Sequence, residues 1–177
     1  MQLQKLKILM IGPCESGKTS IANFISESIN IEESEAIRPT QGVRIVEFEI
    51  PNVTSNGEQN NIDIELWDCS GDHKFECCWP ALRVGVKGVI LVSSPNTANA
   101  SRELELLYNY FVSQPKLSTK QCVVFYNCLD EHEDAILNLS PTFSRVSQVA
   151  INMKTRSDHI KMAFKNFVSS ILQSISD

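Results

Sequence analysis

The chain has 177 residues, 42% of them hydrophobic and 21% charged, and a formal net charge of −5. These values are typical of a single soluble globular domain, which we expect to span residues 1–177. The acidic balance argues against nucleic acid and anionic membranes as partners, and the apolar runs are too short to cross a bilayer, so we expect no direct membrane anchor. The six cysteines form no C-x-x-C pair, which favours free thiols in a reducing cytoplasm.

Strand and helix patterns alternate along most of the chain. An Asn56-Gly57 pair within a polar segment predicts a hairpin between the second and third strands. Because the remaining strands alternate with helices, we expect an α/β fold with a mostly parallel six-stranded sheet, one antiparallel edge strand and helices on both faces. The predicted strands cover residues 5–11, 43–50, 62–67, 88–93, 122–126 and 146–151, and the predicted helices follow residue 19 and cover 99–112 and 157–175.

A phosphate-binding loop pattern, G-x-x-x-x-G-K-[ST], follows the first strand and precedes the first helix. In such a loop the backbone N–H groups and the helix N-terminus face an anion. The lysine supplies a charged donor to the outer phosphates, and the threonine hydroxyl is a ligand for Mg²⁺. The residues of this candidate site are Gly12, Pro13, Cys14, Glu15, Ser16, Gly17, Lys18 and Thr19, with Ser20 next to them.

Two further motifs are predicted at the same edge of the sheet, where ligands of open α/β sheets bind. Pro39-Thr40-Gln41-Gly42 precedes the second strand, and Trp67-Asp68-Cys69-Ser70-Gly71 ends the third. The three motifs in this order resemble the Ras/Rab family of small GTPases. The resemblance implies a P-loop small GTPase fold that binds GTP or GDP with Mg²⁺. It also implies that Thr40 and Asp68 join Thr19 at the metal and that Gly71 meets the γ-phosphate, beside Cys69, Ser70 and Asp72.

The similarity becomes more specific around the second and third motifs. The segments 39–44 and 67–72, followed by Lys74-Phe75-Glu76 and Cys78-Trp79-Pro80-Ala81, resemble the Rab-like GTPases of intraflagellar transport complex B. That resemblance implies a nucleotide-dependent subunit that acts in cilium assembly and transport. It further implies a location in the cytoplasm, the cilium or flagellum and the ciliary base, with coiled-coil subunits of the complex as partners.

Several positions depart from the Ras/Rab pattern. Asp72 occupies the place of the glutamine that orients the attacking water, so we predict very slow intrinsic hydrolysis and assign no catalytic residue with confidence. His73 reads as an exposed histidine, although a role as a base is the alternative. Cys14 replaces a small residue and would crowd the space that a partner's arginine enters. Glu15 would weaken anion binding only if it pointed inward.

The base-recognition motif, N-K-x-D in this family, corresponds to Asn127-Cys128-Leu129-Asp130. Cys128 replaces the lysine that packs over the base, which predicts weaker nucleotide binding. Two interpretations of Asp130 remain open, because it either recognises guanine or begins the acidic loop that follows it.

Three functions are compatible with a phosphate loop. A GTP-binding interaction subunit is favoured by Asp72 and Cys14, and a conventional cycling GTPase switch in vesicle or ciliary trafficking is the alternative. A small-metabolite kinase is disfavoured because no arginine-bearing lid is visible. Within the segment expected to change with the nucleotide, we predict that Trp79 lies in the core and that Phe75 lies at a partner interface.

Overall fold

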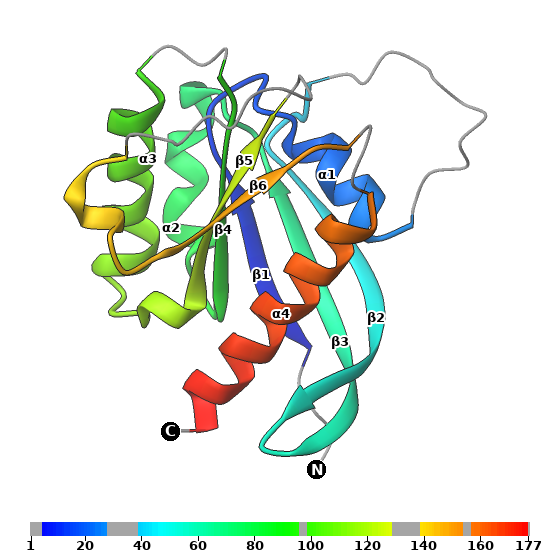
Figure 1. The fold of residues 1–177 in the computed structure, drawn as a ribbon. Coiled ribbons are helices and arrows are strands. Elements are labelled where there is room, and N and C mark those ends of the chain that lie inside the picture. The colour runs from blue at the N-terminus through cyan, green and yellow to red at the C-terminus, as the bar shows by residue number, and fades with distance from the viewer. Residues whose placement is uncertain (1–4, 28–38, 96–98, 129–138, 154–156, 177) are drawn as a thin grey trace.

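The computed structural model describes residues 5–27, 39–95, 99–128, 139–153 and 157–176. The strands of these residues are β1 (Leu6–Ile11), β2 (Val43–Ser55), β3 (Glu58–Cys69), β4 (Gly88–Ser93), β5 (Cys122–Asn127) and β6 (Ser147–Ile151). They form one six-stranded sheet in the order β2-β3-β1-β4-β5-β6 (Figure 1). All neighbouring pairs run parallel except β2 and β3, so the predicted sheet with one antiparallel edge strand is confirmed.

Helices cover both faces of the sheet, as predicted (Figure 1). One face carries α1 (Lys18–Ile25) and α4 (Ser157–Ser176), and the other carries α2 (Trp79–Leu82) and α3 (Ala100–Tyr108). None of the helices in the described ranges is both long and apolar enough to span a membrane. The shorter helical turns are η1 (His73–Cys78), η2 (Asn109–Ser113), η3 (Thr119–Gln121) and η4 (Pro141–Phe143).

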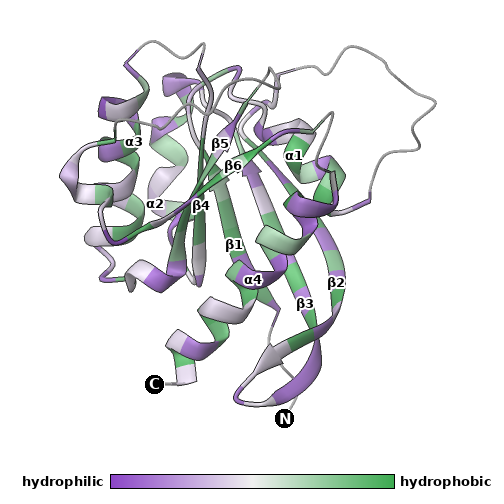
Figure 2. Ribbon diagram, viewed as in Figure 1, coloured by the Kyte–Doolittle hydropathy of each residue, from purple (hydrophilic) through white to green (hydrophobic). Residues whose placement is uncertain are grey.

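Strand β1 divides the hydrophobic core into two clusters. Its side chains alternate between the faces, so Ile8 and Met10 pack toward α1 and α4, whereas Leu9 and Ile11 pack toward α2 and α3. Every residue of β1, β4 and β5 is buried, as expected for parallel strands covered on both sides. Figure 2 shows the corresponding apolar band through the middle of the sheet. These buried strands form the rigid support for the loops at their carboxyl ends.

Two elements differ in length from the sequence prediction. The hairpin strands continue through the polar segment as far as Ser55 and Glu58. Most side chains of this extension are exposed at the sheet edge, whereas Val53 is buried in the core. Asn56 and Gly57 form the predicted tight turn, with φ angles of 51° and 81°. The predicted helix 99–112 ends as an α-helix at Tyr108 and continues as the wider turn η2, in which Phe111 and Val112 remain buried.

Candidate functional site

A cavity of about 530 Å³ opens at the carboxyl edge of the sheet. It lies between the loop after β1, the segment before β2 and the loop after β3, which are the three predicted motifs. Its lining residues are Cys14, Glu15, Gly17, Lys18, Thr19, Ser20, Pro39, Thr40, Gln41, Cys69, Ser70, Gly71, Asp72 and Lys74. The sequence motifs therefore meet in space, and most of the predicted site residues contribute to one surface.

The loop after β1 curls around the ammonium group of Lys18. Gly17 has a φ angle of 89°, a left-handed conformation that glycine adopts without strain, and α1 begins at the next residue. The Lys18 Nζ donates hydrogen bonds to the carbonyl oxygens of Gly12 at 2.9 Å and Pro13 at 2.6 Å, and to Ser16 Oγ at 3.2 Å. Burial lowers the pKa of Lys18. The cation is thus held inside the loop by neutral acceptors, which an anionic ligand would outcompete.

Three oxygen-bearing side chains converge beside this loop. Thr19 Oγ1 lies 2.8 Å from Thr40 Oγ1 and donates a hydrogen bond to Asp68 Oδ2 at 2.8 Å. Thr40 Oγ1 donates to the same carboxylate oxygen at 3.3 Å. The sequence prediction grouped these residues as metal ligands, and the structure places them together. Thr19 comes from α1, Thr40 from the segment before β2, and Asp68 from β3.

Asp68 is suited to hold a cation. Its side chain is fully buried, and its Oδ1 has no hydrogen-bond partner among the described residues. Burial raises the pKa of this carboxyl group, against the lowering effects of the Thr19 hydroxyl, Arg44 and Lys18. A buried carboxylate with an unused oxygen, next to two hydroxyls, is the hard oxygen donor set that Mg²⁺ prefers. The residues present therefore fit a magnesium ion bound beside a phosphate.

The loop after β3 approaches the phosphate loop closely at Gly71. A Cβ atom at this position would lie 2.5 Å from the backbone nitrogen of Cys14 and the carbonyl carbon of Pro13, so a larger residue would force the two loops apart. The next residue, Asp72, caps η1 through its carboxylate. That carboxylate accepts a hydrogen bond from the Lys74 backbone N–H at 3.0 Å and pairs with Lys74 Nζ at 2.9 Å.

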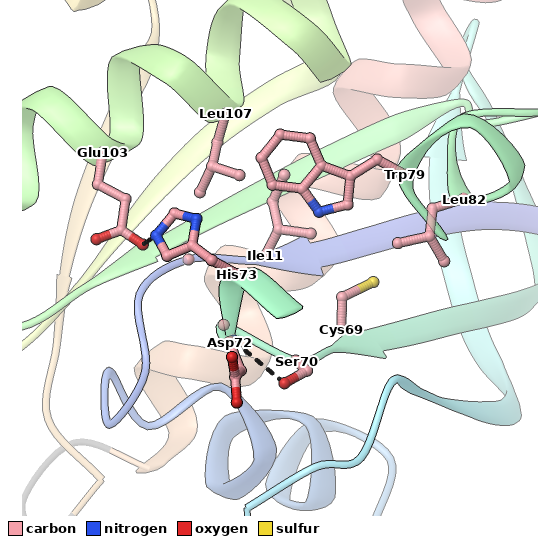
Figure 3. Close-up of a pocket in the computed structure, with 11 residues that line it drawn as sticks. Ile11, Cys69, Ser70, Asp72, His73, Trp79, Leu82, Glu103 and Leu107 are labelled. Atoms are coloured by element: carbon pink, nitrogen blue, oxygen red, sulfur yellow. Dashed lines mark hydrogen bonds and ion pairs between the residues drawn. The ribbon is translucent and has the colours of Figure 1, made fainter. Parts of the chain in front are cut away.

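A small pocket behind this loop faces α3 (Figure 3). His73 Nε2 lies 3.5 Å from a carboxylate oxygen of Glu103 on α3, while its Nδ1 contacts Glu76 of η1. The His73 side chain is 62% exposed, which agrees with its interpretation as an exposed histidine. Asp72 extends away from this pair in Figure 3, and its backbone N–H donates to Ser70 Oγ at 3.2 Å.

The unusual residues of the phosphate loop lie in the solvent-exposed part of the cavity lining. Cys14 and Glu15 are exposed, and Glu15 has a φ angle of 60°. Because both residues line the cavity, the expected effects of Cys14 and Glu15 stay predictions. Cys69, in contrast, is buried beneath the site, and burial raises the pKa of its thiol to about 12. It acts as a packing residue that remains protonated.

The base-recognition segment is described only in part. Asn127 Nδ2 donates a hydrogen bond to the Ser16 carbonyl oxygen at 3.2 Å, so the end of β5 supports the phosphate loop. Cys128 is buried, and its thiol lies 3.8 Å from the Tyr126 carbonyl oxygen instead of lining the cavity. Leu129 and Asp130 lie outside the described residues, so recognition of the base by Asp130 stays a prediction.

Sequence reasoning missed four residues around the cavity. Pro39, Gln41 and Lys74 line it, and Arg44 reaches Asp68 from the neighbouring strand. Pro39 and Gln41 flank Thr40 in the motif, so their position next to Thr40 was the available sequence signal. Arg44 was recognisable only from the hairpin register, which places it directly opposite Asp68.

The fold and the three converging motifs define the class of protein, a Ras-like small GTPase domain. The family model of the Roc (Ras of Complex) domain of DAPkinase matches residues 7–130. This match includes the phosphate loop, Thr40, the motif after β3 and the end of β5.

Full-length relatives narrow the class further. The intraflagellar transport protein 22 homologs of Homo sapiens and Mus musculus are 43% and 42% identical over 175 residues, which cover 98% of this chain and 93% of each relative. The chain therefore belongs to the intraflagellar transport protein 22 family of Rab-like GTPases. The GTP-bound T. brucei IFT22/74/81 crystal structure contains a similar chain, with a TM-score of 0.80, 24% identity and 98% coverage of both chains; at this identity the likeness bears on the fold.

Proposed function

We propose that the chain is a GTP-binding subunit of intraflagellar transport complex B and that Mg²⁺ accompanies the nucleotide. The observation that carries this proposal is the convergence of Thr19, Thr40 and Asp68 beside the phosphate loop. A fully buried carboxylate next to two hydroxyls has a clear use when a metal and a phosphate lie against it. The family relationship supplies the transport role.

Each part of the site has a distinct task in this proposal. Lys18 exchanges its loop carbonyl acceptors for phosphate oxygens, which are stronger acceptors because they are charged. The backbone N–H groups at the start of α1 complete the anion cradle. Thr19, Thr40 and Asp68 hold the metal, which would neutralise phosphate charge when bound. Because Thr40 belongs to the segment before β2, phosphate and metal binding would also fix that segment.

The partners follow from the family. In T. brucei, IFT22 has been crystallised in a GTP-bound IFT22/74/81 assembly. We propose that this chain likewise joins coiled-coil subunits of the complex, in the cytoplasm and the cilium, and that nucleotide-dependent ordering around Thr40 and η1 sets the affinity. Exposed apolar side chains flank these segments, including Val43 and Ile45 on β2.

Nucleotide titration of the purified full-length chain tests the proposal. GTP and GDP should bind in the presence of Mg²⁺, whereas ATP should not compete at similar concentration. Lys18→Ala should weaken guanine nucleotide binding by roughly a hundredfold or more, since it removes a charge-assisted contact to the phosphates. Lys161→Ala, which alters an exposed lysine on α4, is the matched control and should bind normally. Equal binding of ATP and GTP, or an unaffected Lys18→Ala, would contradict the proposed function.

A further inference from the structure

Arg44 is a charged residue beside the proposed metal site for which the family motifs assign no role. It pairs directly opposite Asp68 in the antiparallel β2–β3 ladder, so both side chains lie on the same face of the sheet. Arg44 Nη2 lies 3.6 Å from Asp68 Oδ2, the same oxygen that accepts the hydrogen bonds of Thr19 and Thr40. Arg44 therefore places a positive charge next to the oxygen atoms that would bind a divalent cation.

The contact between Arg44 and Asp68 is not a complete structural ion pair. A distance of 3.6 Å is too long for a hydrogen bond, and a stable arginine–carboxylate pair is usually bidentate. Within the part of the chain that the structure describes, Nε and Nη2 of Arg44 are buried without a hydrogen-bond partner, and so is Asp68 Oδ1. Unsatisfied buried groups on both partners are costly, so the arrangement is not optimised for the strength of the pair itself. The arrangement places a positive charge near the Asp68 carboxylate and leaves Asp68 Oδ1 available to a ligand.

The burial of Asp68 explains why a countercharge is useful. The Asp68 side chain has no exposed surface, whereas 40% of the Arg44 side chain is exposed. A buried carboxylate strongly favours a nearby cation, because water cannot solvate its negative charge. A bound divalent ion would supply this cation. In the absence of the ion, Arg44 on the neighbouring strand is the positive charge that remains near Asp68. Lys18 contributes less directly, since its ammonium group is held by the loop carbonyls.

We propose that Arg44 is a resident countercharge of the metal site: it stabilises the ionised Asp68 in the metal-free protein and, by repelling the incoming cation, lowers the affinity for Mg²⁺. This inference rests on the proposed nucleotide and metal site and concerns its regulation. Arg44 acts through Asp68 and is therefore a positioning residue. As a consequence, the fold of the protein depends less on bound Mg²⁺ than it would if Asp68 were buried without a nearby positive charge.

The competing explanation is that Arg44 serves only to hold the hairpin together. A purely structural cross-strand pair would contribute equally to stability with and without Mg²⁺, and its loss would leave the metal affinity unchanged. The two explanations therefore differ in how stability responds to the metal. Melting temperature and half-saturating Mg²⁺ concentration, both measured with GDP present, separate them without any measurement of hydrolysis.

The experiment compares wild type with Arg44→Met, which keeps an unbranched apolar stem in place of the arginine and removes its charge. In EDTA, Arg44→Met should melt several degrees lower than wild type, and saturating Mg²⁺ should restore most of the difference. The Mg²⁺ concentration for half-maximal stabilisation should fall by about threefold or more, because the substitution removes a positive charge that repels a nearby divalent ion. Arg44→Lys should behave nearly as wild type, because it restores a positive charge.

Arg83→Met is the matched control, since Arg83 contacts Tyr110 and Gln114 far from the cavity lining. It should lower the melting temperature equally in EDTA and in Mg²⁺. If Arg44→Met needs as much Mg²⁺ as wild type, or more, the inference is wrong. Should Arg44→Met not fold, Arg44→Gln and Arg44→Lys provide the same comparison of charge loss with charge retention. A wild type that does not respond to GDP and Mg²⁺ would refute the proposed function and this inference together, whereas a responsive wild type with an unchanged variant refutes the inference alone.

Discussion

Asp72 lines the cavity, but its side chain is engaged within its own segment. Its carboxylate is bound by the backbone N–H and the ammonium group of Lys74. These contacts lower the pKa of Asp72, so the group is anionic at neutral pH. An anion that caps a helical turn neither orients an attacking water nor balances the charge that develops on the transferred phosphate. Slow hydrolysis is therefore expected both from the charge of Asp72 and from its engagement with Lys74.

Replacing Asp72 with glutamine should accelerate single-turnover GTP hydrolysis, by on the order of tenfold, because a neutral amide on a longer side chain is able to orient water. Asp72→Asn is the matched control: it removes the charge and keeps a capping oxygen for the Lys74 backbone N–H, yet it remains too short. Its rate should stay close to that of wild type. A wild type that hydrolyses GTP rapidly and becomes slower on substitution with glutamine would overturn this explanation.

At this scale the sequence predicted the positions of Thr19, Thr40 and Asp68, because each motif adjoins the carboxyl end of a strand. It did not predict that the Asp72 carboxylate is engaged by Lys74. Nor did it predict Arg44, whose significance appears only once the strand register places it opposite Asp68. A sequence motif identifies residues that lie at the carboxyl edge of the sheet. Contacts between two particular side chains also depend on the strand register and on the side-chain rotamers.

At the scale of elements, a histidine of η1 forms an ion pair with α3. His73 contacts Glu76 within η1 and Glu103 on α3, and Asp72 lies next to it. The hydrogen bond with Glu76, together with the negative charges of Glu103, Glu76 and Asp72, raises the pKa of His73 above its ordinary value of 6.5. Because the folded protein binds this proton more tightly than the unfolded chain, the stabilisation is complete below about pH 6.5 and is lost as the pH rises through the higher, folded pKa.

The melting temperature of wild type should therefore fall more between about pH 6 and pH 8 than that of a His73→Gln variant, which has no proton to lose at this position. The effect will be small, because the side chain is largely exposed and the pair is screened by solvent. His159→Gln, which alters an exposed histidine on α4, should keep the wild-type pH dependence. Parallel curves for wild type and His73→Gln would show that the contact to α3 does not depend on the charge of His73.

The elements themselves were predicted well where the apolar pattern was strong. Strands β1, β4 and β5 read as buried runs, and they are buried. The exposed ends of the β2–β3 hairpin were underestimated, because polar residues at a sheet edge carry no pattern that separates a strand from a loop. The change from α3 to η2 was also missed, since a π turn keeps apolar residues in the core without a break in the pattern.

At the scale of the whole molecule, the order of strands and helices predicted a mostly parallel sheet with one antiparallel edge strand, because parallel strands need helical connections whereas a short turn joins antiparallel ones. Residues in the same short segment, however, serve different parts of the molecule. Trp79 is partly buried and packs against Tyr110 and Phe111, with ring centroids 5.2 and 5.4 Å apart, so it contacts the core cluster under α2 and α3. Phe75 is half-buried and lies close to Gly42, between the two segments that border the cavity.

This division predicts that folding and assembly are separable. Trp79→Ala should destabilise the protein by about 2–3 kcal/mol, because it removes a large aromatic side chain from the core, and the melting temperature should fall accordingly. Phe75→Ala should cost less than about 1 kcal/mol, since its ring is only half-buried. In a pull-down with the proposed coiled-coil partners, Phe75→Ala should lose binding in the GTP-loaded state, because a partner helix would pack on exposed aromatic surface beside the nucleotide. Val84→Ala, which truncates an exposed apolar residue after α2, serves as the control and should retain both stability and binding. Normal partner binding by Phe75→Ala, or a loss of melting temperature as large as that of Trp79→Ala, would place Phe75 with the core and the interface elsewhere.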